Sequence, residues 1–91
     1  MQFEWDEDKA ISNLKKHKIA FEDALYVFTD FQRIEALDNR QNYGEERWNT
    51  IGLAAGALIF VTYTVRGDII RIISARKANG QESKKYRQGA F

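Results

Sequence analysis

The sequence of 91 residues predicts an α+β fold: a short N-terminal strand, two helices, an antiparallel β-meander and a short C-terminal helix. Two observations support this prediction. Apolar side chains recur at helical spacing in residues 6–30, whereas residues 31–78 form short apolar runs separated by polar and glycine-containing turns. Since 44% of the residues are hydrophobic, the chain can bury one modest core, and we expect a single domain over residues 1–91.

At the N-terminus, the spacing of apolar residues changes from that of a strand to that of a helix. Residues 1–5, MQFEW, alternate as a short strand does, and Asp6 then stands where a helix N-cap belongs. A first helix is therefore predicted over residues 6–18. The residues expected to form its inward stripe are Ala10, Ile11 and Leu14.

A second helix is predicted over residues 21–30, FEDALYVFTD, with an acidic first turn that suits the helix dipole. Its buried face is expected to consist of Phe21, Ala24, Leu25 and Phe28. Both helices are expected on one face of the sheet that follows.

The remaining elements alternate with turn signals. Strands are predicted at residues 31–37, 47–54, 57–65 and 69–78, a polar loop at 38–46, a turn at 55–56 and a short helix within 80–91. Because consecutive strands are joined by short connections, we expect an antiparallel meander of four strands.

Composition excludes several classes of protein. The chain has no cysteine and one histidine, so it lacks the ligands for a zinc site and the thiols for a disulfide framework. The acidic N-terminus does not resemble a signal peptide, and the longest apolar run is too short for a membrane-spanning helix. We expect a cytoplasmic protein with no cofactor and no membrane contact.

Basic residues are concentrated towards the C-terminus. Residues 61–91 hold seven basic and two acidic side chains, while residues 1–60 hold seven basic and eleven acidic ones. A basic region on a nearly neutral domain attracts polyanions locally. Ordinary solvated charge explains any single lysine equally well.

Arg71 lies within the apolar run IIRIISARKA, where an unpaired buried guanidinium would be costly. A two-residue turn at 67–68 pairs Thr64 with Arg71 and Thr62 with Ile73, which directs Arg71 to the open face of the sheet. The same register puts Ser74 beneath the helices and Ala75 on the open face.

Arg71 and Arg76 share a face only if the strand bulges or ends near Ala75. The alternative role for Arg71 is an intramolecular salt bridge, for example to Glu35.

The first helix carries a second polar group. Lys9, Asn13 and His17 are spaced by four residues and line one flank of the helix. His17 is a candidate general acid or base, because imidazole exchanges protons near neutral pH. The alternative is a packed histidine that caps a nearby carbonyl or carboxylate.

Guanidinium, ammonium, hydroxyl and imidazole groups bind phosphate and stabilise a pentavalent phosphorane without a metal ion. With these groups, a small protein can cleave RNA by letting the 2′-hydroxyl attack the adjacent phosphate. The same groups can also serve nucleic-acid binding alone.

Three segments together resemble the BrnT family of toxins from bacterial toxin–antitoxin modules. They are FEWDEDKAISNLKKHKIAFEDALYVF, GEERWNTIG and RIISARKANGQESKKY, and they span Phe3 to Tyr86 in the order of the family. The opening motif W-D-x-x-K-x-x-x-N-x-x-K-H appears as Trp5, Asp6, Lys9, Asn13, Lys16 and His17, and the closing R-I-I-S-A-R-K-A as Arg71 to Ala78.

The resemblance implies a RelE-like fold and a metal-independent endoribonuclease that inhibits translation. It also implies neutralisation by a cognate antitoxin of the BrnA type, through which the complex would bind operator DNA. The alternative is a non-catalytic protein, a degenerate toxin that only binds RNA or its antitoxin.

Roles for individual residues follow from the likeness to RelE-like toxins. Arg71 is expected to clamp the phosphate, and Arg76 and Lys77 to stabilise the leaving group or bound RNA. Tyr86 and His17 are the candidates for proton transfer. The lysines expected to bind RNA are Lys9, Lys84 and Lys85.

Two features of the resemblance bear on local structure. Lys18 replaces the glycine that usually follows the lysine–histidine pair, so the first helix can end differently here. In the segment Glu45, Glu46, Arg47 and Trp48, we favour structural roles: Trp48 in the core and Arg47 paired with a carboxylate. Glu45 stays open as a general base.

Overall fold

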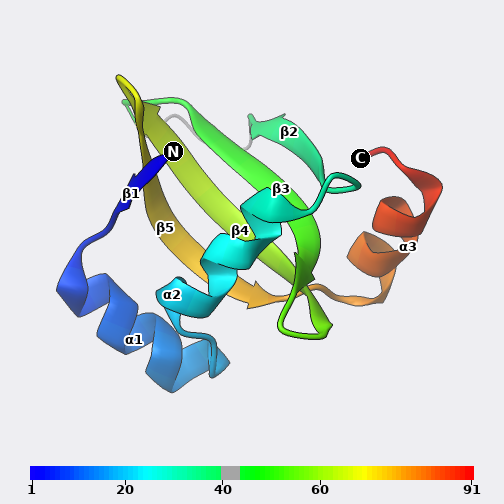
Figure 1. Cartoon of the computed structure of the whole chain (residues 1–91), viewed down its shortest axis with the longest axis horizontal. Helices are drawn as coiled ribbons and strands as arrows, with labels where there is room; N and C mark the ends of the chain where they lie inside the picture. Colours follow the sequence, from blue (N-terminus) through cyan, green and yellow to red (C-terminus); the bar gives the residue numbers. More distant parts are fainter. Residues whose placement is uncertain (40–43) are drawn as a thin grey trace.

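The computed structural model describes residues 1–39 and 44–91 (Figure 1). In chain order the elements are β1 (Gln2–Glu4), α1 (Glu7–His17), α2 (Phe21–Ala24), the 3-10 helix η1 (Leu25–Thr29), β2 (Ile34–Asp38), β3 (Arg47–Ala54), β4 (Ala57–Arg66), β5 (Ile69–Lys77) and α3 (Gly80–Gln88). The predicted element types are confirmed; of the loop predicted at 38–46, residues 40–43 lie outside the described residues.

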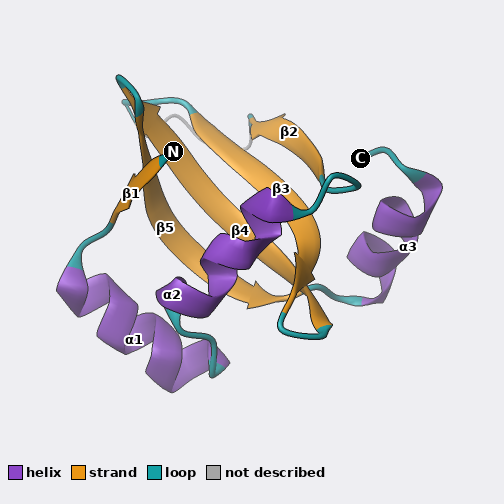
Figure 2. Ribbon diagram, viewed as in Figure 1, coloured by secondary structure: helices purple, strands orange, loops and turns teal. Residues whose placement is uncertain are grey.

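The sheet has five strands in the order β1-β5-β4-β3-β2 (Figure 2). Strands β2 to β5 pair antiparallel with their neighbours in sequence, which confirms the meander of four strands. The whole sheet is not a simple meander, because β1 pairs in parallel with β5 at the edge farthest from β2. The first and last strands are therefore neighbours.

Helix α1 begins at the predicted cap, where the side chain of Asp6 accepts hydrogen bonds from the backbone N–H groups of Asp8 and Lys9. It ends at Lys18, which adopts the left-handed conformation (φ 63°) usually taken by glycine. Lys18 therefore ends the helix in the conformation that a glycine would take, at some conformational cost.

The predicted inward stripe of α1 is partly wrong. Ile11 is 61% exposed and Leu14 49% exposed, Ala10 is half-buried, and the buried residue of the helix is Asn13. The reason is that α1 packs against β5 through the flank that carries Asn13, whose side chain binds the backbone of Ala75.

The main core lies between the sheet and the second helical segment. The predicted face of that segment is confirmed, with Phe21, Ala24 and Phe28 buried and Leu25 half-buried. From Leu25 onwards the helix tightens to 3-10 geometry. The buried sheet residues of this cluster are Ala54, Ile59, Val61, Tyr63, Ile72 and Ala75.

Strand β2 begins three residues later than predicted. Residues 31 and 32 form a turn, in which Asp30 accepts hydrogen bonds from the backbone N–H groups of Gln32 and Arg33. An aspartate that binds the backbone two residues on favours a turn over a strand.

Helix α3 packs on the opposite face of the sheet. Tyr86 packs with Phe60 and Ile51, and Phe60 precedes the core residue Val61 and so faces the other side of β4. Figure 2 shows α3 apart from α1 and α2. The prediction of helices on one face therefore holds for the first two helical segments only.

Within the described ranges, no helix is both long and apolar enough to cross a membrane.

Candidate functional site

A β-bulge in β5 sets the geometry of the open face. The predicted register holds from the turn to the pair Tyr63 and Ile72 and then shifts, so that Thr62 pairs with Ser74 rather than with Ile73. The side chains after the bulge change sides, and the predicted positions of Ser74 and Ala75 are wrong. Ala75 is fully buried in the core.

The bulge brings three polar side chains of β5 onto one surface. Arg71, Ser74 and Arg76 pair with Thr64, Thr62 and Phe60 of β4, which alternate on the open face. The two arginines therefore share a face, which is the condition that sequence periodicity alone left open. We call Arg71, Ser74 and Arg76 the open-face triplet.

Arg71 is held by a carboxylate from the neighbouring strand. Its Nη1 donates to Oε2 of Glu4 at 2.7 Å, and the two residues are register partners across β1 and β5. The partner is not Glu35, which accepts a hydrogen bond from Tyr63. The Arg71 side chain keeps 27% of its surface exposed, and its other nitrogens make no hydrogen bond to a described residue.

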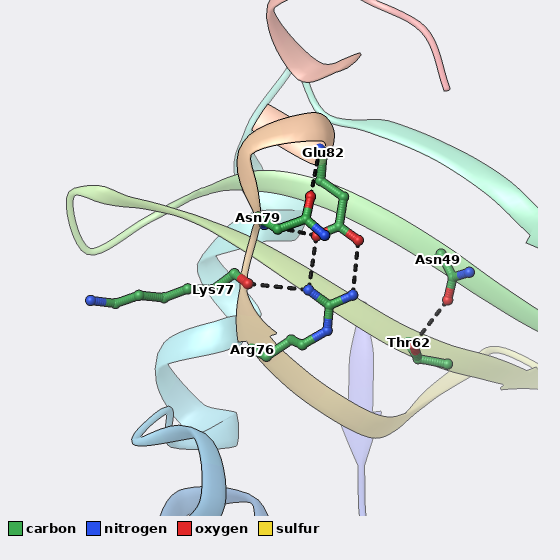
Figure 3. Close-up of polar contacts among 6 residues, drawn as sticks. All are labelled: Asn49, Thr62, Arg76, Lys77, Asn79 and Glu82. Atoms are coloured by element: carbon green, nitrogen blue, oxygen red, sulfur yellow. Dashed lines mark hydrogen bonds and ion pairs between the residues drawn. The ribbon is translucent and has the colours of Figure 1, made fainter. Parts of the chain in front are cut away.

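Arg76 is bound more tightly. Its Nη1 and Nη2 donate to the two carboxylate oxygens of Glu82, both at 2.8 Å, and Nη1 also donates to the carbonyl of Lys77 at 3.2 Å (Figure 3). The guanidinium lies 4.3 Å from the centre of the Phe60 ring, a cation–π contact. These contacts fix the guanidinium plane over the open face.

Glu82 also shapes the start of α3. It accepts a hydrogen bond from the backbone of Asn79, whose side chain accepts one from the backbone of Glu82, a capping box. The hydrogen bonds from Arg76 lower the pKa of Glu82, against the opposing effect of partial burial. A carboxylate with a lowered pKa is a poor general base, so its role is to orient Arg76.

A row of small polar groups continues the open face towards β3. Thr62 donates to the side-chain oxygen of Asn49 at 2.9 Å (Figure 3), and Thr64 donates to the backbone carbonyl of Glu46 at 2.6 Å. Asn49, Thr62 and Thr64 are buried. The hydroxyls of Thr62 and Thr64 thus hold neighbouring segments together beside the triplet.

The structure also places the predicted lysines. Figure 3 shows the side chain of Lys77 extending away from Arg76, and it lines a depression with Lys18 and Ile59 on the helix-covered side. Lys84 and Lys85 are exposed on α3. The ammonium group of Lys77 is therefore not placed beside the guanidinium of Arg76.

Tyr86 is engaged within the fold. Its hydroxyl donates to Oδ2 of Asp30 at 2.6 Å, and this bond, together with burial, raises the pKa of Tyr86 to about 12. Burial opposes but does not outweigh the hydrogen bonds from Tyr86, Leu53 and Gln32, which lower the pKa of Asp30. The contact anchors α3, and a role of Tyr86 in proton transfer stays a prediction.

His17 and Lys9 lie together by the edge of β5, where they line a pocket with the bulge residue Ile73. Asn13, the third member of the predicted flank, has a structural role. Trp48 packs against the core as expected, and Arg47 approaches a carboxylate, that of Glu45, at 3.9 Å.

Sequence reasoning missed the two acidic partners of the site, Glu4 and Glu82. Glu4 precedes its partner by 67 positions and meets it only through the parallel pairing of β1, which no local pattern signals. For Glu82 a signal was present, because Asn79 and Glu82 have capping-box spacing in front of a helix.

The arrangement suits an anionic ligand. Two oriented guanidinium groups and one serine hydroxyl lie on a single surface. Both Nη atoms of Arg76 are bound to Glu82, whereas Arg71 uses only Nη1 on Glu4, so its other nitrogens can bind phosphate oxygens. Across the described part of the chain, no group of three or more His, Asp or Glu side chains could hold a metal ion.

Comparison with known proteins agrees with this chemistry. No curated protein matches the chain. A family model described as "Ribonuclease toxin, BrnT, of type II toxin-antitoxin system" matches residues 5–82, which include the triplet, both helical segments and the capping box. The chain therefore belongs to the BrnT family of ribonuclease toxins of type II toxin–antitoxin systems.

Proposed function

We propose that this toxin is a metal-independent endoribonuclease whose active surface is the open-face triplet. The observation that supports this most directly is the bulge at Ile73, which puts Arg71, Ser74 and Arg76 on one face. Without the bulge, Arg71 and Arg76 would point to opposite sides of the sheet. A bulge that re-aims side chains is common next to active sites.

In the proposed reaction, the 2′-oxygen of one nucleotide attacks the adjacent phosphorus while the bond to the 5′-oxygen breaks. Negative charge grows on the phosphoryl oxygens, and Arg71 and Arg76 are placed to stabilise it. A base takes the proton of the 2′-hydroxyl and an acid protonates the leaving oxygen. By family likeness, His17 and Tyr86 are the candidates for these two steps, and Glu45 stays open as a base.

The antitoxin partner is also proposed from the likeness to the family. Membership of a type II system implies an antitoxin. We assign it to the BrnA type, covering the active surface and supplying the contact to operator DNA. The α+β architecture with an antiparallel meander is compatible with a RelE-like fold.

A second function is favoured by a specific observation. Both arginines of the triplet are paired with carboxylates, Arg71 with Glu4 and Arg76 with Glu82. A chain in which these ion pairs are purely structural would be a degenerate toxin that binds RNA or its antitoxin without cleavage.

The test is growth arrest and RNA cleavage by the wild type beside Arg71→Gln. We expect induced wild type to stop growth and purified wild type to cut RNA in the presence of a chelator, whereas R71Q loses about 100-fold or more of its cleavage rate. A matched control is Arg87→Gln, since Arg87 is an exposed arginine of α3 that lies outside the triplet.

Far-UV circular dichroism should show that both variants are folded. Cleavage by R71Q at the rate of R87Q would remove Arg71 from the active surface. A folded wild type that cuts no RNA would instead favour the binding protein.

A further inference from the structure

A shallow pocket lies beside the part of the β5 edge that β1 does not cover. Strand β1 pairs with β5 only as far as Arg71, and beyond that point α1 flanks the edge. The pocket has a volume of about 190 Å³. It is lined by Lys9, Ser12, Asn13, Lys16, His17 and Ile73.

Hydrogen bonds of Asn13 hold the floor of this pocket in place. The amide nitrogen of Asn13 donates to the carbonyls of Ile19 (2.9 Å) and Ala75 (2.8 Å), and its oxygen accepts from the N–H of Ala75 at 3.1 Å. Asn13 is buried and thereby ties α1 to β5. The residues three or four positions away on the same flank project around it.

The pocket is positively charged without a compensating carboxylate. The side chains of Lys9, Lys16 and His17 make no ion pair or hydrogen bond with any residue in the described ranges, in contrast to Arg71 and Arg76. The C-terminal end of α1 carries a partial negative charge of about one half, which two full ammonium charges exceed. Uncompensated cations around a concave surface attract an anion.

The pocket adjoins the open-face triplet. Ile73, which forms one wall, is the bulged residue and is followed directly by Ser74. A chain lying across the open face past Arg71 and Ser74 therefore reaches the pocket by crossing the edge of β5. A polyanion with regularly spaced phosphates fits this continuity, whereas a single small anion would need only one of the two places.

We infer that this pocket binds a backbone phosphodiester of single-stranded RNA, next to the segment held by the triplet. Lys9 and Lys16 supply point charges, Ser12 a hydroxyl donor and His17 an imidazole N–H. The inference rests on the proposed function in so far as the ligand is RNA. It adds Lys16 and Ser12 to the RNA-binding residues and gives His17 a binding role besides proton transfer.

The test uses a fluorescent single-stranded RNA in which every 2′-hydroxyl is methylated, so that attack by the 2′-oxygen cannot occur. Its affinity for the wild type and for Lys9→Gln/Lys16→Gln is measured by anisotropy over a range of salt concentrations. The matched control is Lys15→Gln/Lys18→Gln, which removes the same charge from side chains of α1 and its C-cap that do not line the pocket.

We expect the slope of log affinity against log salt to fall by about 0.7 in K9Q/K16Q, because the pocket holds one phosphodiester and each lost phosphate contact in a single strand lowers the slope by about 0.7. The control double variant should keep the wild-type slope. Equal slopes for both double variants would overturn the inference, because the lysines would then act only through net charge.

A second readout reports on the pocket itself. The chain has a single histidine, so the ring signals in a proton NMR spectrum belong to His17 without ambiguity. The methylated RNA should shift these signals in the wild type and in the control, but not in K9Q/K16Q. Signals that stay unmoved while the RNA binds would overturn the inference.

Two further measurements show whether a negative result contradicts the RNA-binding pocket or the proposed ribonuclease activity. Inorganic phosphate at the same phosphate concentration should leave the His17 signals unchanged if the ligand is a chain; an equal shift would overturn the assignment to RNA. Because the methylated RNA cannot be cut, a wild type that cleaves no natural RNA but shows the expected slopes would contradict the proposed function and leave the pocket supported.

Discussion

Asn13 is the residue whose loss should cost most stability for its size. Its amide satisfies both backbone groups of Ala75 at the edge of β5, as well as the carbonyl of Ile19. Asn13→Ala would leave these buried groups without partners. We expect the free energy of unfolding to fall by about 3 kcal/mol, measured by urea denaturation.

Ser12→Ala is the control for that variant, because Ser12 is an exposed neighbour on the same helix and should change stability by less than about 0.5 kcal/mol. Equal effects of the two substitutions would show that Asn13 is not the tie between α1 and β5. The sequence placed Asn13 on a functional flank, since a polar residue on a helix gives no sign that its partner is a strand edge.

Glu82 should cause the free energy of unfolding to fall as the pH becomes acidic. Its pKa in the folded protein lies below the ordinary glutamate value of 4.5, chiefly through the hydrogen bonds from Arg76. A lowered folded-state pKa contributes stability that is present above the unfolded pKa and lost as the pH falls through the folded one. Between pH 6 and pH 3, Glu82→Gln should therefore lose less stability than the wild type does.

Urea unfolding across this pH range measures the difference. Asp30 also has a lowered pKa, so some acid sensitivity should remain in E82Q. Parallel curves for the wild type and E82Q would mean that the pair with Arg76 adds nothing to folding.

Among the elements, α3 depends on few contacts. None of its residues is buried, and it is tied to the fold by Tyr86 and by the pair of Arg76 and Glu82. Tyr86→Phe removes the hydrogen bond to Asp30, which we expect to be worth about 1.5 kcal/mol. Trypsin should then cut faster at Lys84 and Lys85, as followed by mass spectrometry.

Tyr26→Phe is the matched control, because Tyr26 is 60% exposed on η1 and removing its hydroxyl should leave the cleavage rate unchanged. If Y86F resists trypsin as well as Y26F does, α3 is held by its packing on Phe60 and by its capping box, not by Asp30.

The sequence predicts elements where local chemistry decides them. Strand β3 has the predicted bounds, because it is set off by the loop before Arg47 and the turn at Ala55. The position of β1 could not be read, since parallel pairing with β5 depends on the path of the whole chain. The presence of the bulge could not be predicted from the sequence either. One extra residue in β5 exchanges the faces of Ser74 and Ala75 without altering the apolar pattern before it.

At the scale of the molecule, the ion pair of Glu4 and Arg71 joins the first strand to the last. Exchanging the two residues of this pair therefore distinguishes the ribonuclease from the non-catalytic binding protein. An ion pair in either orientation can stabilise the fold, but only catalysis requires the guanidinium to be on β5. Arg71→Glu alone sets two carboxylates side by side and should lower the free energy of unfolding by about 1 kcal/mol. The exchanged variant Glu4→Arg/Arg71→Glu restores an ion pair and should recover most of that loss.

The exchange moves the positive charge by one strand spacing, about 5 Å, away from Ser74 and Arg76. A phosphate clamp cannot tolerate this displacement, because stabilisation of the transition state depends on donors fixed in place before the reaction. For a catalytic Arg71, the exchanged variant should therefore unfold at nearly the wild-type urea concentration while its RNA cleavage falls about 100-fold or more. A stable exchanged variant that still cuts RNA at the wild-type rate would make Arg71 a structural partner of Glu4 and move the search for the catalytic cation to Arg76.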